Sequence, residues 1–159
     1  LPLSYMGFSG YINPFTIEAH FNTNIAKLNI PTTICHEIAH QLGYSAENEA
    51  NYISIEATLN SKNEYVNYSG STFALKHLLN EMYLNDKKAF DELIKKVNVG
   101  VLKNYKEASD EWKKYKNPLE KYFKKSYDIY LKANNQTKGI KTYNLVVDLL
   151  VNKYPNQES

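Results

Sequence analysis

The chain has 159 residues, 43% of them hydrophobic and 13% aromatic, which is enough apolar material for one domain with its own core. Its net charge is only +2 and it contains no arginine, the usual reader of phosphate and guanine, so nucleic acid is excluded as an expected partner. The single cysteine, Cys35, excludes an internal disulfide and is interpreted as a small buried residue.

Residues 1 to 30 are predicted to form a small amino-terminal β element with loops. Between Thr16 and Asn24, apolar residues alternate with polar ones, which is typical of a short hairpin or an edge strand. His20 belongs to the polar positions of this pattern and is expected to be a surface residue of the strand.

Residues 31 to 60 are predicted to form a metal-binding helix pair. The first helix follows Pro31, and Thr32 or Thr33 is expected to cap it. It carries His36 and His40, which project from the same face because they are four residues apart. Two such histidines with a glutamate after the first are the pattern that a zinc hydrolase places on one helical turn.

In that pattern Glu37 would serve as general base and acid beside a zinc ion held by His36 and His40. Gly43 is predicted to end this helix, because glycine accepts the left-handed conformation of a helix C-terminus. A second helix should then run from Ala46 to Leu59, with Ser45 as its cap.

Beyond Asn60 the sequence predicts a helical subdomain, residues 61 to 159. Turns are expected at Ser61-Lys62-Asn63 and at Ser69-Gly70-Ser71. Amphipathic helices are expected at about 71–84, 87–97, 101–115, 118–134 and 140–153. His77 lies in the first of them without a partner at metal spacing, so a structural or surface role is predicted. The fold class is therefore mainly α (α+β), in a single zincin-like domain.

Charge is unevenly divided along the chain. Residues 1–60 contain one lysine and five acidic residues, whereas residues 61–159 contain 18 lysines and 12 acidic residues. The half that carries the histidine motif is thus acidic, and the lysine-rich helices are interpreted as solvated faces over an aromatic core.

The segment Glu47-Asn48-Glu49-Ala50-Asn51, following the histidine motif, resembles the gluzincin arrangement, in which a glutamate on a second helix completes the zinc site. The resemblance implies that Glu47 is the third ligand and that Asn51 orients a histidine through its free ring nitrogen. Glu49 is the alternative third ligand. In gluzincins a strand beside the metal helix also pairs with the extended substrate, which implies such a role for the strand near His20.

A wider resemblance rests on Phe8 to Thr16, Cys35 to Gly43 and Gly139 to Tyr143. These segments look like those of a bacterial family of membrane-anchored proteins with a domain of unknown function. The resemblance implies a zinc site and proteolysis, with the substrate open. No stretch of the chain is apolar enough to span a bilayer. Any membrane anchor is therefore expected outside this fragment. The domain itself is expected to be soluble, and the extracytoplasmic side of the membrane is favoured.

The sequence therefore predicts a zinc metallopeptidase that cleaves a peptide or protein substrate. A tyrosine is expected to stabilise the oxyanion, with Tyr143, in the segment that matches the family, as first choice and Tyr68 as second. The alternative is a zinc-binding but catalytically silent interaction or sensor domain. The two differ in whether the fourth coordination position is open to water.

Overall fold

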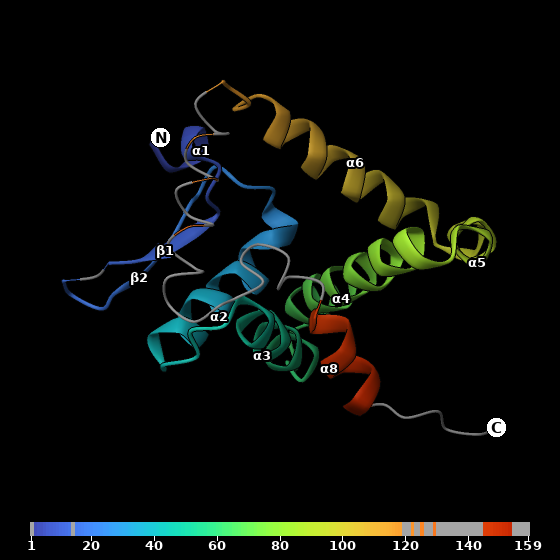
Figure 1. The fold of residues 1–159 in the computed structure, drawn as a ribbon, viewed down its shortest axis with the longest axis horizontal. Coiled ribbons are helices and arrows are strands. Elements are labelled where there is room, and N and C mark those ends of the chain that lie inside the picture. Colours follow the sequence, from blue (N-terminus) through green and yellow to red (C-terminus); the bar gives the residue numbers. More distant parts are fainter. Residues whose placement is uncertain are drawn as a thin grey trace.

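The structure is a computed structural model that describes residues 2–13, 15–118, 122, 125, 129 and 145–153. It is mainly helical with one small antiparallel sheet, which confirms the predicted fold class. In Figure 1, α2 (Ile30–Gln41) lies between the hairpin on one side and α3 (Glu47–Leu59) and α4 (Glu64–Asn85) on the other. The remaining described helices are α1 (Pro2–Met6), η1 (Lys27–Asn29), α5 (Lys87–Leu93), η2 (Ile94–Lys96), α6 (Val99–Lys113) and α8 (Val146–Lys153).

The sheet is a hairpin of β1 (Gly10–Ile12) and β2 (Ala19–Phe21), with Tyr11 opposite His20. The predicted strand between Thr16 and Asn24 is confirmed for its central three residues. Asn13 shapes the connecting loop, because its side-chain oxygen accepts hydrogen bonds from the backbone N–H groups of Phe15 and Thr16. The hairpin packs on α2 through both strands.

The helix that carries His36 and His40 begins earlier than predicted. Helix α2 starts at Ile30, directly after the 3-10 turn η1, and Pro31 lies in its first turn, where its fixed φ angle and missing N–H are tolerated. The expected caps Thr32 and Thr33 are therefore wrong: the N-cap is Asn29, without a side-chain hydrogen bond, and the Thr32 hydroxyl donates to the Asn29 carbonyl.

Helix α3 also lacks the predicted cap. Its N-cap is Ala46 rather than Ser45, and no side chain caps it. Two acidic residues in its first turn, Glu47 and Glu49, instead favour the positive end of the helix dipole. The predicted extent of this helix is otherwise confirmed to within one residue.

The turn predicted at Ser69-Gly70-Ser71 is wrong, because these residues lie inside the long helix α4. Gly70 is used for packing: a Cβ atom built on it would lie 2.8 Å from the Cβ of Thr58 on α3. The Ser69 hydroxyl donates to the Leu28 carbonyl, which ties α4 to the turn before α2. A glycine that reads as a turn signal thus marks a close crossing of helices.

The apolar core lies where α8 returns to α3 and α4. Ile55, Val146 and Leu150 form its buried centre, and Phe73 of α4 packs against them. This part of the predicted last helix, 140–153, is confirmed, as are the predicted helices near 87–97 and 101–115. The predicted helix 118–134 lies almost wholly outside the described residues. No helix in the described part of the chain has both the length and the apolar character needed to cross a membrane.

Candidate metal centre

The end of helix α2 folds the chain back beside its own histidines. Gly43 has a left-handed backbone, with φ at 103°, and its N–H donates to the His40 carbonyl over 3.0 Å. The N–H of Tyr44 donates to the Ala39 carbonyl over 3.1 Å. This pair of hydrogen bonds is a Schellman motif, as predicted for the glycine, and it turns the chain sharply enough for α3 to begin at Glu47.

The turn brings three potential ligands together from two helices. The Nε2 atom of His36 lies 3.0 Å from that of His40 and 3.3 Å from Oε2 of Glu47. The Nε2 atom of His40 lies 3.7 Å from Oε1 of Glu47. Each residue offers one ligand atom, and these atoms lie within 4.8 Å of one another.

These separations fit a single tetrahedral ion. Ligand atoms about 2.0 to 2.2 Å from zinc, placed at tetrahedral angles, are about 3.3 to 3.5 Å apart, which is the range around which the three distances fall. Two imidazoles and a carboxylate are also the donor types that zinc accepts in catalytic sites, and three such donors leave one position open. The cluster formed by His36, His40 and Glu47 can therefore hold a divalent cation.

The protonation of His40 is set by its neighbours. Its Nδ1 atom lies 2.7 Å from the Tyr44 carbonyl oxygen, so the N–H on that nitrogen is donated to the backbone and Nε2 faces Glu47. Burial by itself lowers the pKa of His40, but the carboxylate of Glu47 and the Tyr44 carbonyl outweigh it and raise the pKa. The cluster thus attracts positive charge, as a cation site must.

Glu47 is the most deeply placed member of the cluster. The residue is 2% exposed, whereas the side chains of His36 and His40 are 15% and 16% exposed. A buried carboxylate is costly unless it is paired or coordinates a metal. Its position at the start of α3, directly opposite the two imidazoles, gives it such partners.

Glu37 lies next to the cluster and is buried against the hairpin. A Cβ atom on Gly10 of β1 would lie 2.6 Å from the Glu37 carboxyl carbon, so only glycine leaves room for that carboxylate. Burial raises the pKa of Glu37, the charges of His36 and His40 oppose this, and the negative charge of Glu47 adds to it. A carboxylate of raised pKa is a stronger base than one in water.

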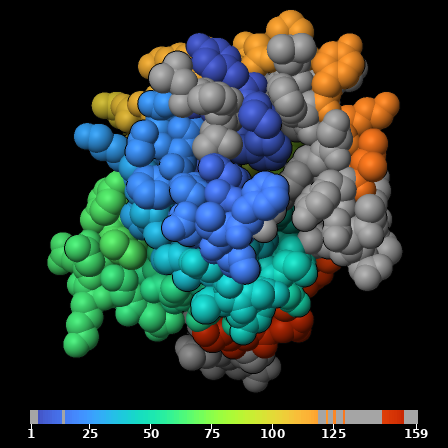
Figure 2. Space-filling view, turned by 90° about the vertical axis from the view of Figure 1, so that its left-hand side faces the viewer, coloured from blue at the N-terminus to red at the C-terminus, as the bar shows by residue number. Residues whose placement is uncertain are grey.

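Glu37 also opens onto solvent through a groove between β2 and α2. The groove has a volume of about 490 Å³. Its walls are Glu18, Ala19, His20 and Phe21 on the hairpin side and Ile34, Glu37, Ile38 and Gln41 on α2. In Figure 2 the hairpin and the cyan region around the end of α2 lie side by side on the same face of the molecule.

Other predicted site residues are placed differently. Glu49 is exposed on α3 and lies outside the cluster, so of these two glutamates Glu47 is the one that faces the imidazoles. Asn51 is 3% exposed, one turn beyond Glu47, but within the described residues its Nδ2 atom has no hydrogen-bond partner. The expected contact of Asn51 with a histidine ring stays a prediction, and the Nδ1 atom of His40 lies beside the Tyr44 carbonyl oxygen.

The predicted oxyanion tyrosines are not brought to the cluster by any described contact. Tyr143 lies outside the described residues. The Tyr68 hydroxyl accepts a hydrogen bond of 2.7 Å from the Asn104 side chain of α6. Of the other histidines, His20 stacks on Tyr11 as a strand residue, and His77 packs edge-on against Phe73. Burial lowers the pKa of His77 to about 4, with the charges of Lys76 and His36 acting in the same direction.

Two features of the site were missed by sequence reasoning. Tyr44 acts through its backbone, which no side-chain pattern reveals, although the position of Gly43 would have predicted a carbonyl near His40. Gly10 is visible in the sequence only as one glycine near the start of a short strand. Its role depends on a contact with Glu37, which is 27 positions away along the chain.

A family model described as "Protein of unknown function (DUF3810)" matches residues 1–151. No curated protein and no solved structure matches the chain. The resemblance to gluzincins therefore stays a prediction, and the chemistry has to be inferred from the site itself.

Proposed function

Because the chain belongs to the DUF3810 family, whose function is not established, we propose from its own site that it is a zinc-dependent peptidase with Glu37 as general base. The observation that carries the proposal is the convergence of His36, His40 and Glu47, with the buried carboxylate of Glu37 next to them. A structural zinc site needs its ligands but has no use for Glu37, which is neither a ligand of the cluster nor ion-paired to a described lysine.

The residues divide the work between holding an ion and moving a proton. His36, His40 and Glu47 would hold zinc, and the Tyr44 carbonyl keeps the His40 ring in the tautomer whose Nε2 is free to bind. When bound, zinc supplies Lewis acidity, which lowers the pKa of water and polarises a peptide carbonyl. Glu37 then takes a proton from the attacking water and returns it to the nitrogen of the leaving amine.

The position of the hairpin supports a peptide as substrate. Glu37 lines the groove between β2 and α2, so a chain lying in that groove passes its carboxylate. Beside the groove runs the outer edge of β2, with which no other strand pairs in the described part of the chain. Such an edge can receive the backbone of an extended peptide.

The experiment compares two variants by metal content and by turnover. Glu37→Gln keeps the shape of the side chain but cannot accept the proton, so it should retain one zinc per chain and lose at least about 100-fold in hydrolysis of a casein or peptide-library substrate. His40→Ala removes a ligand and should lose both zinc and activity. Metal content is read by elemental analysis after dialysis against buffer without chelator.

Each result separates the proposal from its alternative. A wild-type protein that binds zinc but cleaves no peptide, with a fourth protein ligand detected by X-ray absorption at the zinc edge, would establish the catalytically silent domain instead. Full activity in Glu37→Gln would refute the role given to that carboxylate. A wild-type protein that takes up no transition metal would end the proposal.

A further inference from the structure

The groove beside Glu37 has an apolar floor of regular spacing. On α2, Ile34 and Ile38 line the groove, and Leu42 follows four residues later. Ile38 is 42% exposed and Leu42 is 71% exposed, so both offer apolar surface that this chain leaves uncovered. Residues four apart share one face of a helix, and Leu42, the C-cap of α2, still has a right-handed helical backbone, so the three side chains form a row along α2 and its C-terminal end.

The opposite wall is the outer edge of β2, with which no other strand of the described residues pairs. The backbone N–H of Asn22 donates to the Ser9 carbonyl, and the backbone N–H of Asn13 donates to the Glu18 carbonyl. These two bonds show which residue pairs of the hairpin are hydrogen-bonded to each other. Antiparallel pairs alternate between hydrogen-bonded and non-bonded, so Ala19 and Phe21 direct their backbone N–H and C=O groups away from β1. These groups point to the edge at which a further strand can add.

The row on α2 and an added strand match in spacing. Helical residues four apart rise by about 6.0 Å along the axis. Alternate residues of a strand, which point to the same face, are about 6.6 to 6.8 Å apart. Figure 1 shows the hairpin running alongside α2, so a strand added at β2 would pass over that helix with every second side chain directed to the row.

The charge of the groove also selects its occupant. Glu18 and Glu37 both line it, and among the described residues no lysine lies in its walls. The Glu18 side chain is 66% exposed, and in the described part of the chain it receives a hydrogen bond from Thr16 and a long ion pair from His20. A ligand with a basic residue would place positive charge beside Glu18, whereas an acidic ligand would be repelled.

We infer that this groove binds an extended peptide segment with apolar residues at alternate positions and a lysine or arginine beside them. The inference names the substrate class of the peptidase and so rests on the proposed function. Specificity then comes from the row of Ile34, Ile38 and Leu42, which receives the apolar side chains, and from Glu18, which pairs with the basic one. The backbone of the peptide adds to β2.

The test measures binding apart from catalysis, in the zinc-loaded Glu37→Gln variant. The probe is a fluorescein-labelled heptapeptide with leucine at three alternate positions and one terminal lysine, followed by fluorescence anisotropy. Matched peptides replace the leucines with serine or the lysine with glutamate. The leucine and lysine peptide should bind at least about tenfold more tightly than the serine peptide, since each apolar side chain buries surface on α2.

Two variants assign the preference to its residues. Ile38→Ser should weaken binding of the leucine peptide about fivefold, because the exposed part of Ile38 is the surface that the peptide covers. Glu18→Lys should reverse the preference between the lysine and glutamate peptides by about threefold in each direction, the size expected of an exposed ion pair.

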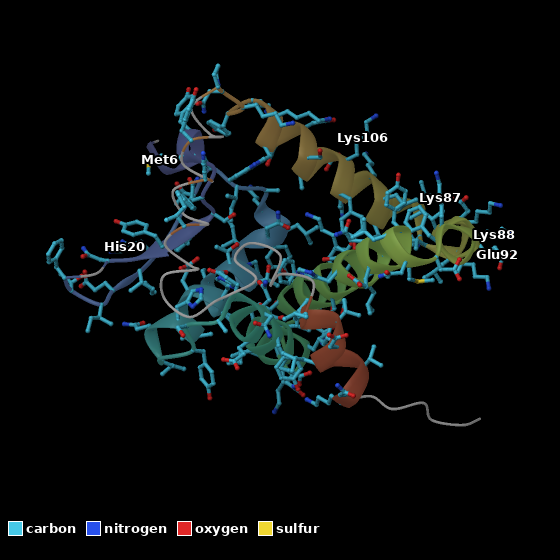
Figure 3. All side chains as sticks on the ribbon, viewed as in Figure 1. Met6, His20, Lys87, Lys88, Glu92 and Lys106 are labelled. Carbon is cyan, nitrogen blue, oxygen red and sulfur yellow. The ribbon has the colours of Figure 1, made fainter. Side chains whose placement is uncertain are left out.

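Matched controls lie away from the groove. Val99→Ser removes a side chain that is 79% exposed at the start of α6, and Glu92→Lys reverses a charge on α5. Figure 3 shows Glu92 at the end of the molecule opposite the hairpin that carries His20. Neither control should change the affinity for any of the peptides.

The outcomes distinguish this inference from the proposed function. If peptide binding is selective and depends on Ile38 and Glu18 but the wild-type protein shows no turnover, the inferred peptide site is supported and only the proposed peptidase activity is overturned. Equal affinity for the leucine and serine peptides, or a preference unaffected by Glu18→Lys, overturns the inference even if the wild-type protein hydrolyses peptides.

Discussion

Glu47 is a buried carboxylate beside two imidazoles, and it is the residue proposed as the third ligand. Glu47→Ala should reduce bound zinc from one per chain to well under half, because two histidines alone hold the ion weakly at micromolar zinc. Glu49→Ala should leave the content unchanged, since that side chain is exposed and lies outside the cluster. Elemental analysis of both dialysed variants decides which glutamate is the third ligand. Equal zinc content in the two variants would show that Glu47 is not a ligand.

Gly10 is the residue that gives Glu37 its place. In Gly10→Ala the added methyl group would overlap the Glu37 carboxylate, so either that side chain or strand β1 must shift. A displacement of about 1 Å at a reacting group can reduce turnover about 100-fold, and we expect a loss of this order. Zinc content should stay at one per chain, because His36, His40 and Glu47 are untouched.

The control for this variant is Gly100→Ala, which adds the same methyl group on α6. It should leave both zinc content and hydrolysis near the wild-type values. Unchanged turnover in Gly10→Ala would mean that the Glu37 carboxylate tolerates a methyl group at β1, and its assigned position would be wrong.

Where α4 crosses α3, α4 has a glycine at a position where helix propensity alone would favour alanine. Alanine replaces glycine inside a helix with a gain of about 1 kcal/mol when nothing obstructs it. At Gly70 the new Cβ would lie 2.8 Å from Thr58 Cβ and 3.1 Å from the Leu59 nitrogen, so the helices must separate. We therefore expect Gly70→Ala to lower the free energy of unfolding by about 1 to 3 kcal/mol.

Urea denaturation followed by circular dichroism measures this change. Ser71→Ala, one residue further along α4 and exposed, provides the comparison and should be neutral or slightly stabilising. If Gly70→Ala proved more stable than the wild type, the close approach of the two helices at this position would be contradicted.

At the scale of helices and strands, a prediction from the sequence was correct where its signal lay within a short stretch of the chain. Helix α2, its end at Gly43 and the approach of Glu47 follow from spacing within about a dozen residues. The caps at Thr32 and Ser45 and the turn at Gly70 failed because tertiary contacts decided them: a 3-10 turn precedes α2, a Schellman turn leads directly into α3, and Thr58 lies over Gly70. The contact of Gly10 with Glu37 has no local pattern at all, and the hydrogen bond from His40 to Tyr44 uses a backbone carbonyl, which no side-chain pattern reveals.

In the molecule as a whole, the cluster of His36, His40 and Glu47 joins α2 and α3, while the hairpin lies against α2 and α8 closes the other side of α3 and α4. A ligand that binds only the folded chain stabilises it by mass action, by about 2.7 kcal/mol when free zinc is 100 times its dissociation constant. For a chain of this length each kcal/mol raises the melting temperature by roughly 2 to 4 °C. Zinc should therefore raise it by about 5 to 10 °C, and EDTA should reverse the shift.

His40→Ala provides the internal control for that shift. Without this ligand the cluster loses its closest nitrogen pair, so the melting temperature of the variant should be the same in zinc and in EDTA. Differential scanning fluorimetry of both proteins, each with and without zinc, measures the difference directly. If zinc does not change the melting temperature of the wild type, or changes that of the variant as strongly, the ion does not bind where α2 and α3 meet.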